Sequence, residues 1–140
     1  MGLVNVRLGL KARLETITGL RVFESPPDSI NEFPVAFVVP VFGEYFRTGS
    51  STSVKWFFEV TVMVERSSNI SDAQTALDPF IDTSGGSSVL AAINGNEDLD
   101  YSESPTVDTS WVQSFKEYGT LIYNNVPYLG VKFDLIAFDL

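Results

Sequence analysis

Apolar and polar positions in the first part of the chain follow a helical and then a strand-like pattern. Apolar residues recur at helical spacing between Leu3 and Ile17, which predicts an amphipathic helix with Gly19 as the residue that ends it. A short strand is expected over residues 20–24. The proline-rich segment that follows, up to Pro34, is expected to be an extended loop, because proline lacks a backbone N–H and restrains the residue before it.

Two longer strands are predicted next. Residues 35–42 are rich in β-branched and aromatic side chains, as in a strand that is apolar on both faces, and Pro40 indicates an edge or a bulge in its far half. The polar tract 48–53 predicts a flexible hairpin loop. Residues 54–65 alternate in hydrophobicity and predict the clearest strand of the chain.

The second half of the chain predicts two helices and then two strands. Ser71 can N-cap a helix from Asp72 to Phe80, in which Pro79 should kink the helix or begin a new turn. A short helix over 88–93 and an acidic loop up to Ser104 follow. The predicted strands cover 106–116 and 128–138, and an ordered loop over 117–127 joins them.

This order of elements predicts an α+β fold. Long strands outnumber helical crossovers, so we expect a mainly antiparallel sheet, with the N-terminal helix and two mid-chain helices packed on one face. No internal repeat or linker divides the chain, so residues 1–140 are expected to form a single domain.

Composition narrows the possible chemistry, because the 140 residues include neither Cys nor His. Disulfides, thiolate or imidazole metal sites, and Ser-His or Cys-His nucleophile pairs are therefore excluded. Eighteen Asp and Glu outnumber nine Lys and Arg, and the formal net charge of −9 argues against a basic surface that grips phosphate backbones. We expect a protein that is not an enzyme, carries no cofactor and acts through its surfaces.

The remaining chemical motifs are weak. Asp82-Thr83-Ser84-Gly85 departs from the Asp-Thr-Gly loop of aspartic proteases and has no second copy, so a helix end is preferred. Alternating oxygens from Asn94 to Asp100 resemble a calcium loop, but Leu99 and Pro105 stand where an EF-hand needs Gly and Glu. The glycine-rich tracts lack the lysine of a phosphate-binding loop, and carboxylate pairs such as Asp78 and Asp82 arise freely in so acidic a chain.

Charge and aromatic content point to self-association instead. Residues 1–21 hold four basic residues and one acidic residue, whereas residues 67–115 hold eight acidic residues and no basic one. A head-to-tail assembly can use such a separation of charge, but charged surfaces that merely face solvent can produce it too. Aromatic residues at mixed or loop positions suggest an apolar surplus that marks a subunit interface. The candidate interface residues are Phe42, Tyr45, Phe46, Phe57, Tyr118 and Tyr123, and the predicted loops 47–53 and 117–127 are the expected interface elements. Tyr128 is a further aromatic residue at such a position.

Several segments taken in order resemble one family. They are Thr18-Gly19-Leu20-Arg21-Val22, Phe33-Pro34-Val35-Ala36-Phe37-Val38-Val39-Pro40, the strand from Trp56 to Val64, Asp72-Ala73-Gln74 with Leu77-Asp78-Pro79-Phe80, Gly86-Ser87-Ser88-Val89-Leu90 with Ala92-Ile93, and Tyr128-Leu129-Gly130-Val131-Lys132-Phe133. Together they resemble the tail terminator, or tail completion, proteins of long-tailed bacteriophages. The resemblance covers nearly the whole chain, and it rests on the order of the segments and the length rather than on any single motif.

The resemblance implies a structural virion protein that forms a hexameric ring. Such a ring caps the head-proximal end of the tail tube, ends tube polymerisation and joins the tail to head-completion or stopper proteins. It implies assembly in the host cytoplasm, no catalytic residue, no cofactor, and DNA that only passes non-specifically through the lumen. If acidic residues 96–108 line that lumen, neutralising Asp98, Asp100 and Glu103 should slow DNA release.

Two alternatives remain open. The chain could be another head–tail connector subunit, such as a stopper, or an α+β module that encloses an apolar cavity for a small ligand. No stretch approaches the roughly 18 consecutive apolar residues of a membrane span, so we expect a protein folded in a reducing cytoplasm without a membrane partner.

Overall fold

A mixed sheet forms the framework of the chain. The computed structural model describes residues 3–65, 69–94 and 109–139, and within these it has five strands in the order β1-β2-β3-β5-β4. The strands are β1 (Arg21–Phe23), β2 (Val35–Thr48), β3 (Ser51–Val64), β4 (Thr109–Tyr123) and β5 (Val126–Asp139). The short β1 runs parallel to β2, and every other neighbouring pair is antiparallel.

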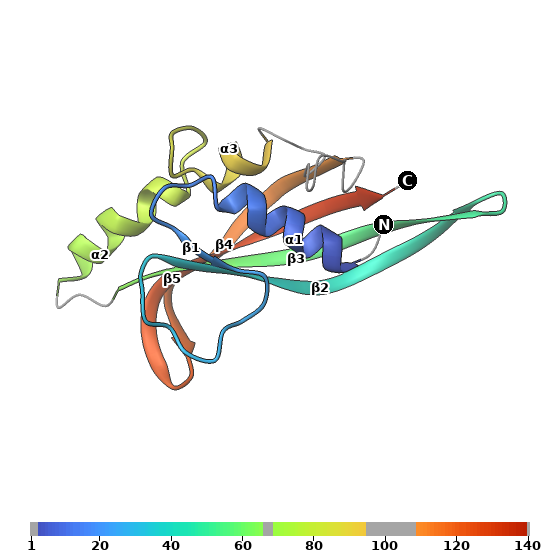
Figure 1. Cartoon of the computed structure of the whole chain (residues 1–140). Coiled ribbons are helices and arrows are strands. Elements are labelled where there is room, and N and C mark those ends of the chain that lie inside the picture. The colour runs from blue at the N-terminus through green and yellow to red at the C-terminus, as the bar shows by residue number, and fades with distance from the viewer. Residues whose placement is uncertain (1–2, 66–68, 95–108, 140) are drawn as a thin grey trace.

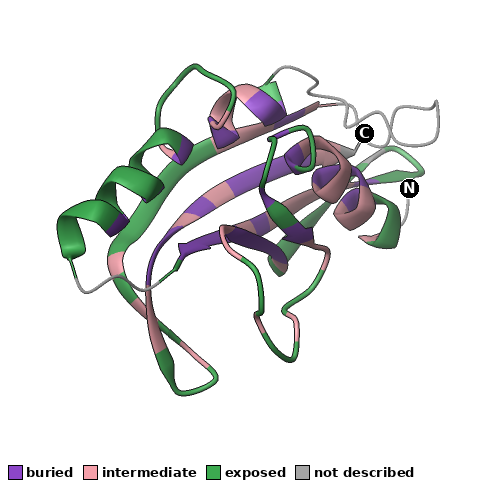
Figure 2. Ribbon diagram, turned by 60° about the vertical axis from the view of Figure 1, so that its left-hand side comes forward, coloured by how far each residue is buried: buried purple, intermediate pink, exposed green. Residues whose placement is uncertain are grey.

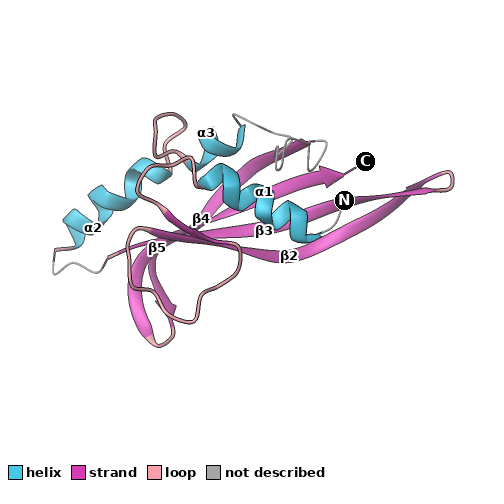
Figure 3. Ribbon diagram, viewed as in Figure 1, coloured by secondary structure: helices cyan, strands magenta, loops and turns pink. Residues whose placement is uncertain are grey.

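The helices lie on one face of this sheet, as Figure 3 shows. They are α1 (Leu3–Leu14), α2 (Ile70–Leu77) with the 3-10 turn η1 (Asp78–Phe80) at its end, and α3 (Val89–Asn94). We call the side that they cover the helical face and the opposite side the open face. The predicted α+β fold, with a mainly antiparallel sheet, is confirmed.

The main core lies between the helices and the helical face. Alternate residues of β3 and β5, such as Phe58, Val60 and Phe133, pack against the apolar stripe of α1, in which Leu10 and Leu14 are fully buried. Figure 2 shows this burial concentrated in the middle of the sheet, while most of α2 and the turn of the β4–β5 hairpin are exposed. The wholly apolar, even-numbered side of the central strand therefore has the expected cause, burial against the helices.

A second, smaller core lies on the open face. Its buried members are Val35, Phe37 and Met63, and the connection 24–34 between β1 and β2 covers them with partly buried side chains such as Phe33. This explains why the sequence of β2 begins apolar on both faces.

The predicted strand that ended at residue 42 was too short. β2 continues to Thr48, and its pairing with β3 shifts register between Pro40 and Phe42, so the expected bulge is present. The expected loop 48–53 contracts to a turn at Gly49 and Ser50, between the paired residues Thr48 and Ser51. The Ser- and Thr-rich sequence 48–53 predicts a loop because it is polar at every position. It therefore lacks the alternation of apolar and polar residues that marks a half-buried strand.

The predicted loop over 117–127 was also wrong. β4 and β5 form a continuous hairpin there, turning at Asn124 and Asn125, whose φ angles are 50° and 65°. Two successive positive φ angles make the tight turn that matches strand twist, and asparagine tolerates this conformation better than most residues. β4 also bulges twice, near Gln113 and between Lys116 and Gly119, which breaks up the alternation in its sequence.

The helix termini follow the prediction with two corrections, one in α2 and one in α1. The N-cap of α2 is Asn69 rather than Ser71, since the Asn69 side chain accepts a hydrogen bond from the Ser71 backbone N–H at 3.0 Å. Pro79 begins the new 3-10 turn, one of the two expected outcomes. The first helix ends at Leu14 rather than at Ile17, and Gly19 has the positive φ of +84° typical of a residue that ends a helical segment.

Candidate assembly interface

The far ends of β2 and β3 form an arm that extends beyond the rest of the sheet (Figure 1). We define the arm as residues 41–54, because β5 pairs with β3 only as far as Val54. From Tyr45 onward β2 has β3 as its only strand neighbour. Among the described residues, no helix or further strand covers the outer part of the arm as such elements cover side chains elsewhere in the fold.

Large apolar side chains on the arm are exposed to solvent. Val41 is 55% exposed, Phe42 is 54% exposed and Tyr45 is 76% exposed. Isolated exposed apolar residues are common, but several together on a projecting ribbon indicate a contact surface.

Four of the predicted interface residues lie on the arm or at its base, and three of them form ring contacts on the open face. Phe42 stacks on Phe57 with ring centroids 4.1 Å apart, and Phe46 packs against Phe138 at 5.1 Å. Lys55 places its ammonium 5.2 Å from the Phe57 ring centroid. The bulge at Val41 aligns Phe42 with Phe57, because it shifts the register by one residue.

Phe138 belongs to this aromatic group, although the sequence did not single it out. It lies opposite Lys55 in the β3–β5 ladder, on the same side of the sheet as Ile136. The sequence could have indicated this residue. In the predicted strand, Ile136 and Phe138 alternate in step with the polar residues Lys132 and Asp134, so they are apolar residues on a face that is otherwise polar.

The tyrosines of the β4–β5 hairpin have partners within the chain. The Tyr118 hydroxyl donates a hydrogen bond to Oδ1 of Asp78 at 2.6 Å, and this bond raises the pKa of Tyr118 to about 12. The Tyr123 hydroxyl donates to the backbone carbonyl of Pro27. Burial raises the pKa of Tyr123, and the negative charge of Asp28 raises it further.

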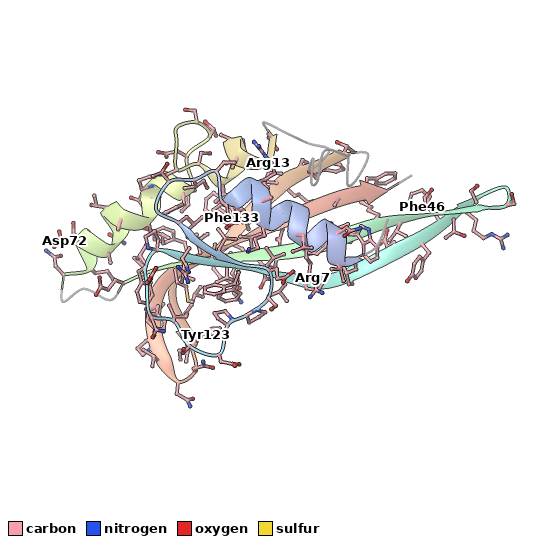
Figure 4. The ribbon with its side chains drawn as sticks, in the orientation of Figure 1. Arg7, Arg13, Phe46, Asp72, Tyr123 and Phe133 are labelled. Atoms are coloured by element: carbon pink, nitrogen blue, oxygen red, sulfur yellow. The ribbon has the colours of Figure 1, made fainter. Side chains whose placement is uncertain are left out.

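The rings of this hairpin pack on the open-face core. Tyr123 lies 5.3 Å from the Phe37 ring and Tyr128 lies 5.2 Å from the Phe33 ring. Figure 4 shows Phe46 at the right and Tyr123 at the lower left, well apart from each other. The predicted interface residues thus form two separate groups rather than one patch, and their role in an interface stays a prediction.

A network of ion pairs connects three strands on the open face between the two aromatic groups. Lys116 Nζ lies 3.2 Å from a carboxylate oxygen of Glu59 and 3.1 Å from one of Asp134, and these carboxylates, Asp134 first, raise the pKa of Lys116. Lys132 pairs with Glu59 at 3.5 Å and with Glu117 at 3.2 Å. The network carries three negative and two positive charges.

A cavity of about 300 Å³ opens on the same face, beside this network. Its apolar wall includes Phe37, Met63, Leu121 and Tyr123, and the ion-paired Glu59 and Lys132 form its polar side. A second cavity, of about 350 Å³, lies near the ends of α1 and η1, and among the described residues Glu65 is its one ionisable lining residue. The first therefore offers the richer set of recognition groups.

The candidate chemistry finds no support in the described residues. Residues 3–65, 69–94 and 109–139 contain no group of three or more acidic side chains placed to hold a metal ion. Asp82 lies in an exposed turn after η1, in keeping with the expected helix end, and the carboxylate of Asp78 accepts the Tyr118 hydrogen bond. Most of the calcium-like segment and the acidic segment 96–108 lie outside the described residues.

Two basic side chains of the N-terminal helix have partners within the chain. Of the basic side chains in α1, Arg13 donates through Nε to the Ala92 carbonyl at 3.0 Å, and Lys11 pairs with Glu15 at 3.6 Å. Within the part of the chain that is described, no helix is long and apolar enough to cross a membrane. Comparison with models of protein families and with curated proteins finds no match to the chain.

Proposed function

We propose that the protein is a non-enzymatic structural subunit that assembles into a closed ring through contacts between identical chains. The observation that carries this proposal is the exposed apolar surface of the arm, where Tyr45 is 76% exposed on a ribbon that no other described element covers. Burying such a surface against a second copy would remove apolar area from water, which is the main driving force of association.

The position of the arm favours a ring over a simple pair. Tyr45 lies at one end of the molecule, so a contact between arms alone would join two copies and stop. A contact between the arm and a different surface of the next copy can repeat, and it closes when its rotation divides a full turn. Unpaired strand edges along the arm offer backbone groups for the same contact.

The resemblance to phage tail terminator proteins gives this ring a role. On that basis the ring is a hexamer in the virion, at the head-proximal end of the tail. It caps the tail tube, ends its polymerisation and meets the head-completion or stopper proteins, while DNA passes non-specifically through the lumen.

The first test is the solution mass of the purified chain together with negative-stain images. We expect a species of six times the chain mass and ring-shaped particles. Tyr45→Ala should shift the mass toward the single chain. Ile70→Ala is the matched control, because Ile70 is 64% exposed on α2 and lies outside the arm. A wild-type chain that stays monomeric at every concentration tested would contradict the proposal.

The second test addresses the virion role. Isolated tail tubes incubated with the ring should carry it at one end only and should no longer elongate when tube subunits are added. Binding to head-completion proteins without binding to tubes would instead favour the connector or stopper alternative.

One observation favours the small-ligand alternative, namely the open-face cavity of about 300 Å³ with its apolar wall and its Glu59–Lys132 pair. That alternative predicts a monomer or dimer that takes up an apolar fluorescent dye. Dye binding that Tyr45→Ala leaves unchanged, in a chain that forms no ring, would support it.

A further inference from the structure

The ring proposal leaves open which surface receives the arm, and the exposed side of the arm narrows the choice. Tyr45 pairs with Val54 and Arg47 pairs with Thr52, so the two side chains occupy alternate positions of β2 on one side of the ribbon. Both are exposed. The arm therefore presents an aromatic ring and a guanidinium together.

The open-face cavity has the volume and the apolar lining to receive one aromatic side chain. Its volume of about 300 Å³ is at the lower limit for pockets that hold small molecules, and its wall is apolar. Glu59 and Lys132 border its polar side with exposed fractions of only 18% and 29%. A tyrosine ring in this cavity would meet Phe37 and Met63, while its hydroxyl would donate to the Glu59 carboxylate or accept from Lys132.

Charge around the cavity matches the guanidinium of the arm. Four carboxylates lie at or near it, those of Glu59, Asp134, Glu117 and Asp28, and two ammonium groups oppose them, those of Lys116 and Lys132. The excess of negative charge favours a cation at the rim, and Glu117, at 54% exposure, is accessible to one.

The arm and the cavity cannot meet within one chain. Figure 1 shows the β2–β3 turn at the right-hand end of the molecule, and the β4–β5 hairpin that borders the cavity at the lower left, well away from that turn. Two complementary surfaces at separate places on one subunit can pair head to tail between copies.

We propose that Tyr45 of one copy enters the open-face cavity of the next copy and that Arg47 lies against the carboxylates at its rim. This inference rests on the self-assembly proposed above and adds the two surfaces that make the contact. It assigns the arm as the donor and the cavity between the 24–34 connection and the β4–β5 hairpin as the acceptor.

Two variants that damage opposite sides of the contact test this pairing. Tyr45→Ala removes the inserted ring and leaves the cavity intact. Val39→Trp places a large side chain at a half-buried cavity position and leaves the arm tip intact. Each should raise the dissociation constant for self-association by about 30-fold or more, the loss typical of an interface hot spot. Tyr45→Phe keeps the ring and should cost about fivefold, the equivalent of one hydrogen bond.

Mixing the two variants gives the sharpest result. One intact arm and one intact cavity remain between them, so equimolar Tyr45→Ala and Val39→Trp should form a heterodimer and nothing larger in sedimentation velocity. Thermal unfolding of each variant confirms that it is folded. If Val39→Trp does not fold, Ile122→Trp replaces it, because Ile122 is 75% exposed and also borders the cavity.

The outcomes separate this inference from the ring itself. A wild-type ring that Tyr45→Ala leaves intact would overturn the insertion and leave the ring proposal standing. Full rings in the mixed sample would also overturn it. Such rings would need contacts that use neither the arm of the Tyr45→Ala chain nor the cavity of the Val39→Trp chain. A wild-type chain that never associates would overturn the ring proposal and the insertion together.

Discussion

Tyr118 connects the β4–β5 hairpin to the turn that follows α2 through its hydrogen bond to Asp78. The bond requires the protonated phenol, since a phenolate could not donate and would repel the Asp78 carboxylate, so the pKa of Tyr118 rises from 10.0 to about 12. The folded chain holds this proton more tightly than the unfolded chain does, and stability becomes linked to pH at this residue.

The linkage predicts a pH window for Tyr118→Phe. The wild type should be more stable than Tyr118→Phe by about 1 kcal/mol below pH 10, a small value because the side chain is 37% exposed. The difference should shrink between pH 10 and pH 12, as the unfolded and then the folded phenol loses its proton. Thermal unfolding of both chains across this range is the measurement, and a constant difference through pH 12 would contradict the hydrogen bond.

Gly130 allows close packing at the centre of the sheet. A Cβ at this position would lie 2.7 Å from the Val62 backbone oxygen and 2.9 Å from Cγ of Met63. Gly130→Ala should therefore destabilise the fold by about 1–3 kcal/mol, because a backbone oxygen cannot move aside as a flexible side chain can. Urea unfolding measures the loss, with Gly86→Ala as the control, since no atom lies within 4 Å of a Cβ built there. Equal midpoints for the two variants would be inconsistent with this packing.

At the scale of elements, the turn at Asn124 and Asn125 holds the β4–β5 hairpin in register. Asn125 has φ of 65°, so Asn125→Ala should cost about 1 kcal/mol, whereas Asn125→Gly should be neutral or stabilising. Urea midpoints compare the two substitutions at the same position. Equal losses for alanine and glycine would show that the side chain of Asn125, and not its backbone conformation, matters here.

Local pattern predicted the elements that have one buried face and failed for those exposed on both faces. The even-numbered residues of β3 from Val54 to Val64 are all apolar, because most of them enter the main core, and the sequence alone predicted this strand. The tracts 43–53 and 117–127 carry polar residues on both sides, so their strand structure comes from pairing with a neighbouring strand. The hydrophobic pattern within one segment does not show such pairing.

The candidate interface was predictable as a set of residues but not as an arrangement. The excess of aromatic side chains at mixed positions identified Phe42 and Phe57, which stack on each other, and Tyr45, which lies on the other side of the ribbon. The same criterion selected Tyr118 and Tyr123, whose hydroxyls bond within the chain. Burial and partners distinguish a core aromatic from an exposed one, and both depend on contacts between distant segments.

At the scale of the whole molecule, a formal net charge of −9 opposes any contact between copies. At about 0.01 M salt the screening length is about 30 Å, so most of the charge on one copy repels the next copy. At about 0.15 M salt the screening length falls to about 8 Å, and the repulsion weakens. Association of the wild type should therefore strengthen between these salt concentrations, because repulsion is screened while apolar burial remains. Sedimentation velocity across a salt series tests this, and weaker association at the higher concentration would contradict it.

The two-stranded end of the arm has a further consequence for the timing of assembly. An isolated ribbon of two strands is only marginally stable in water, so the backbone amides of residues 45–53 should open often in a free chain and exchange their hydrogens within the shortest labelling times. Docking would order them, and part of the binding energy would be spent on that ordering. A subunit built in this way associates reversibly one contact at a time, which lets misplaced copies leave before a ring closes.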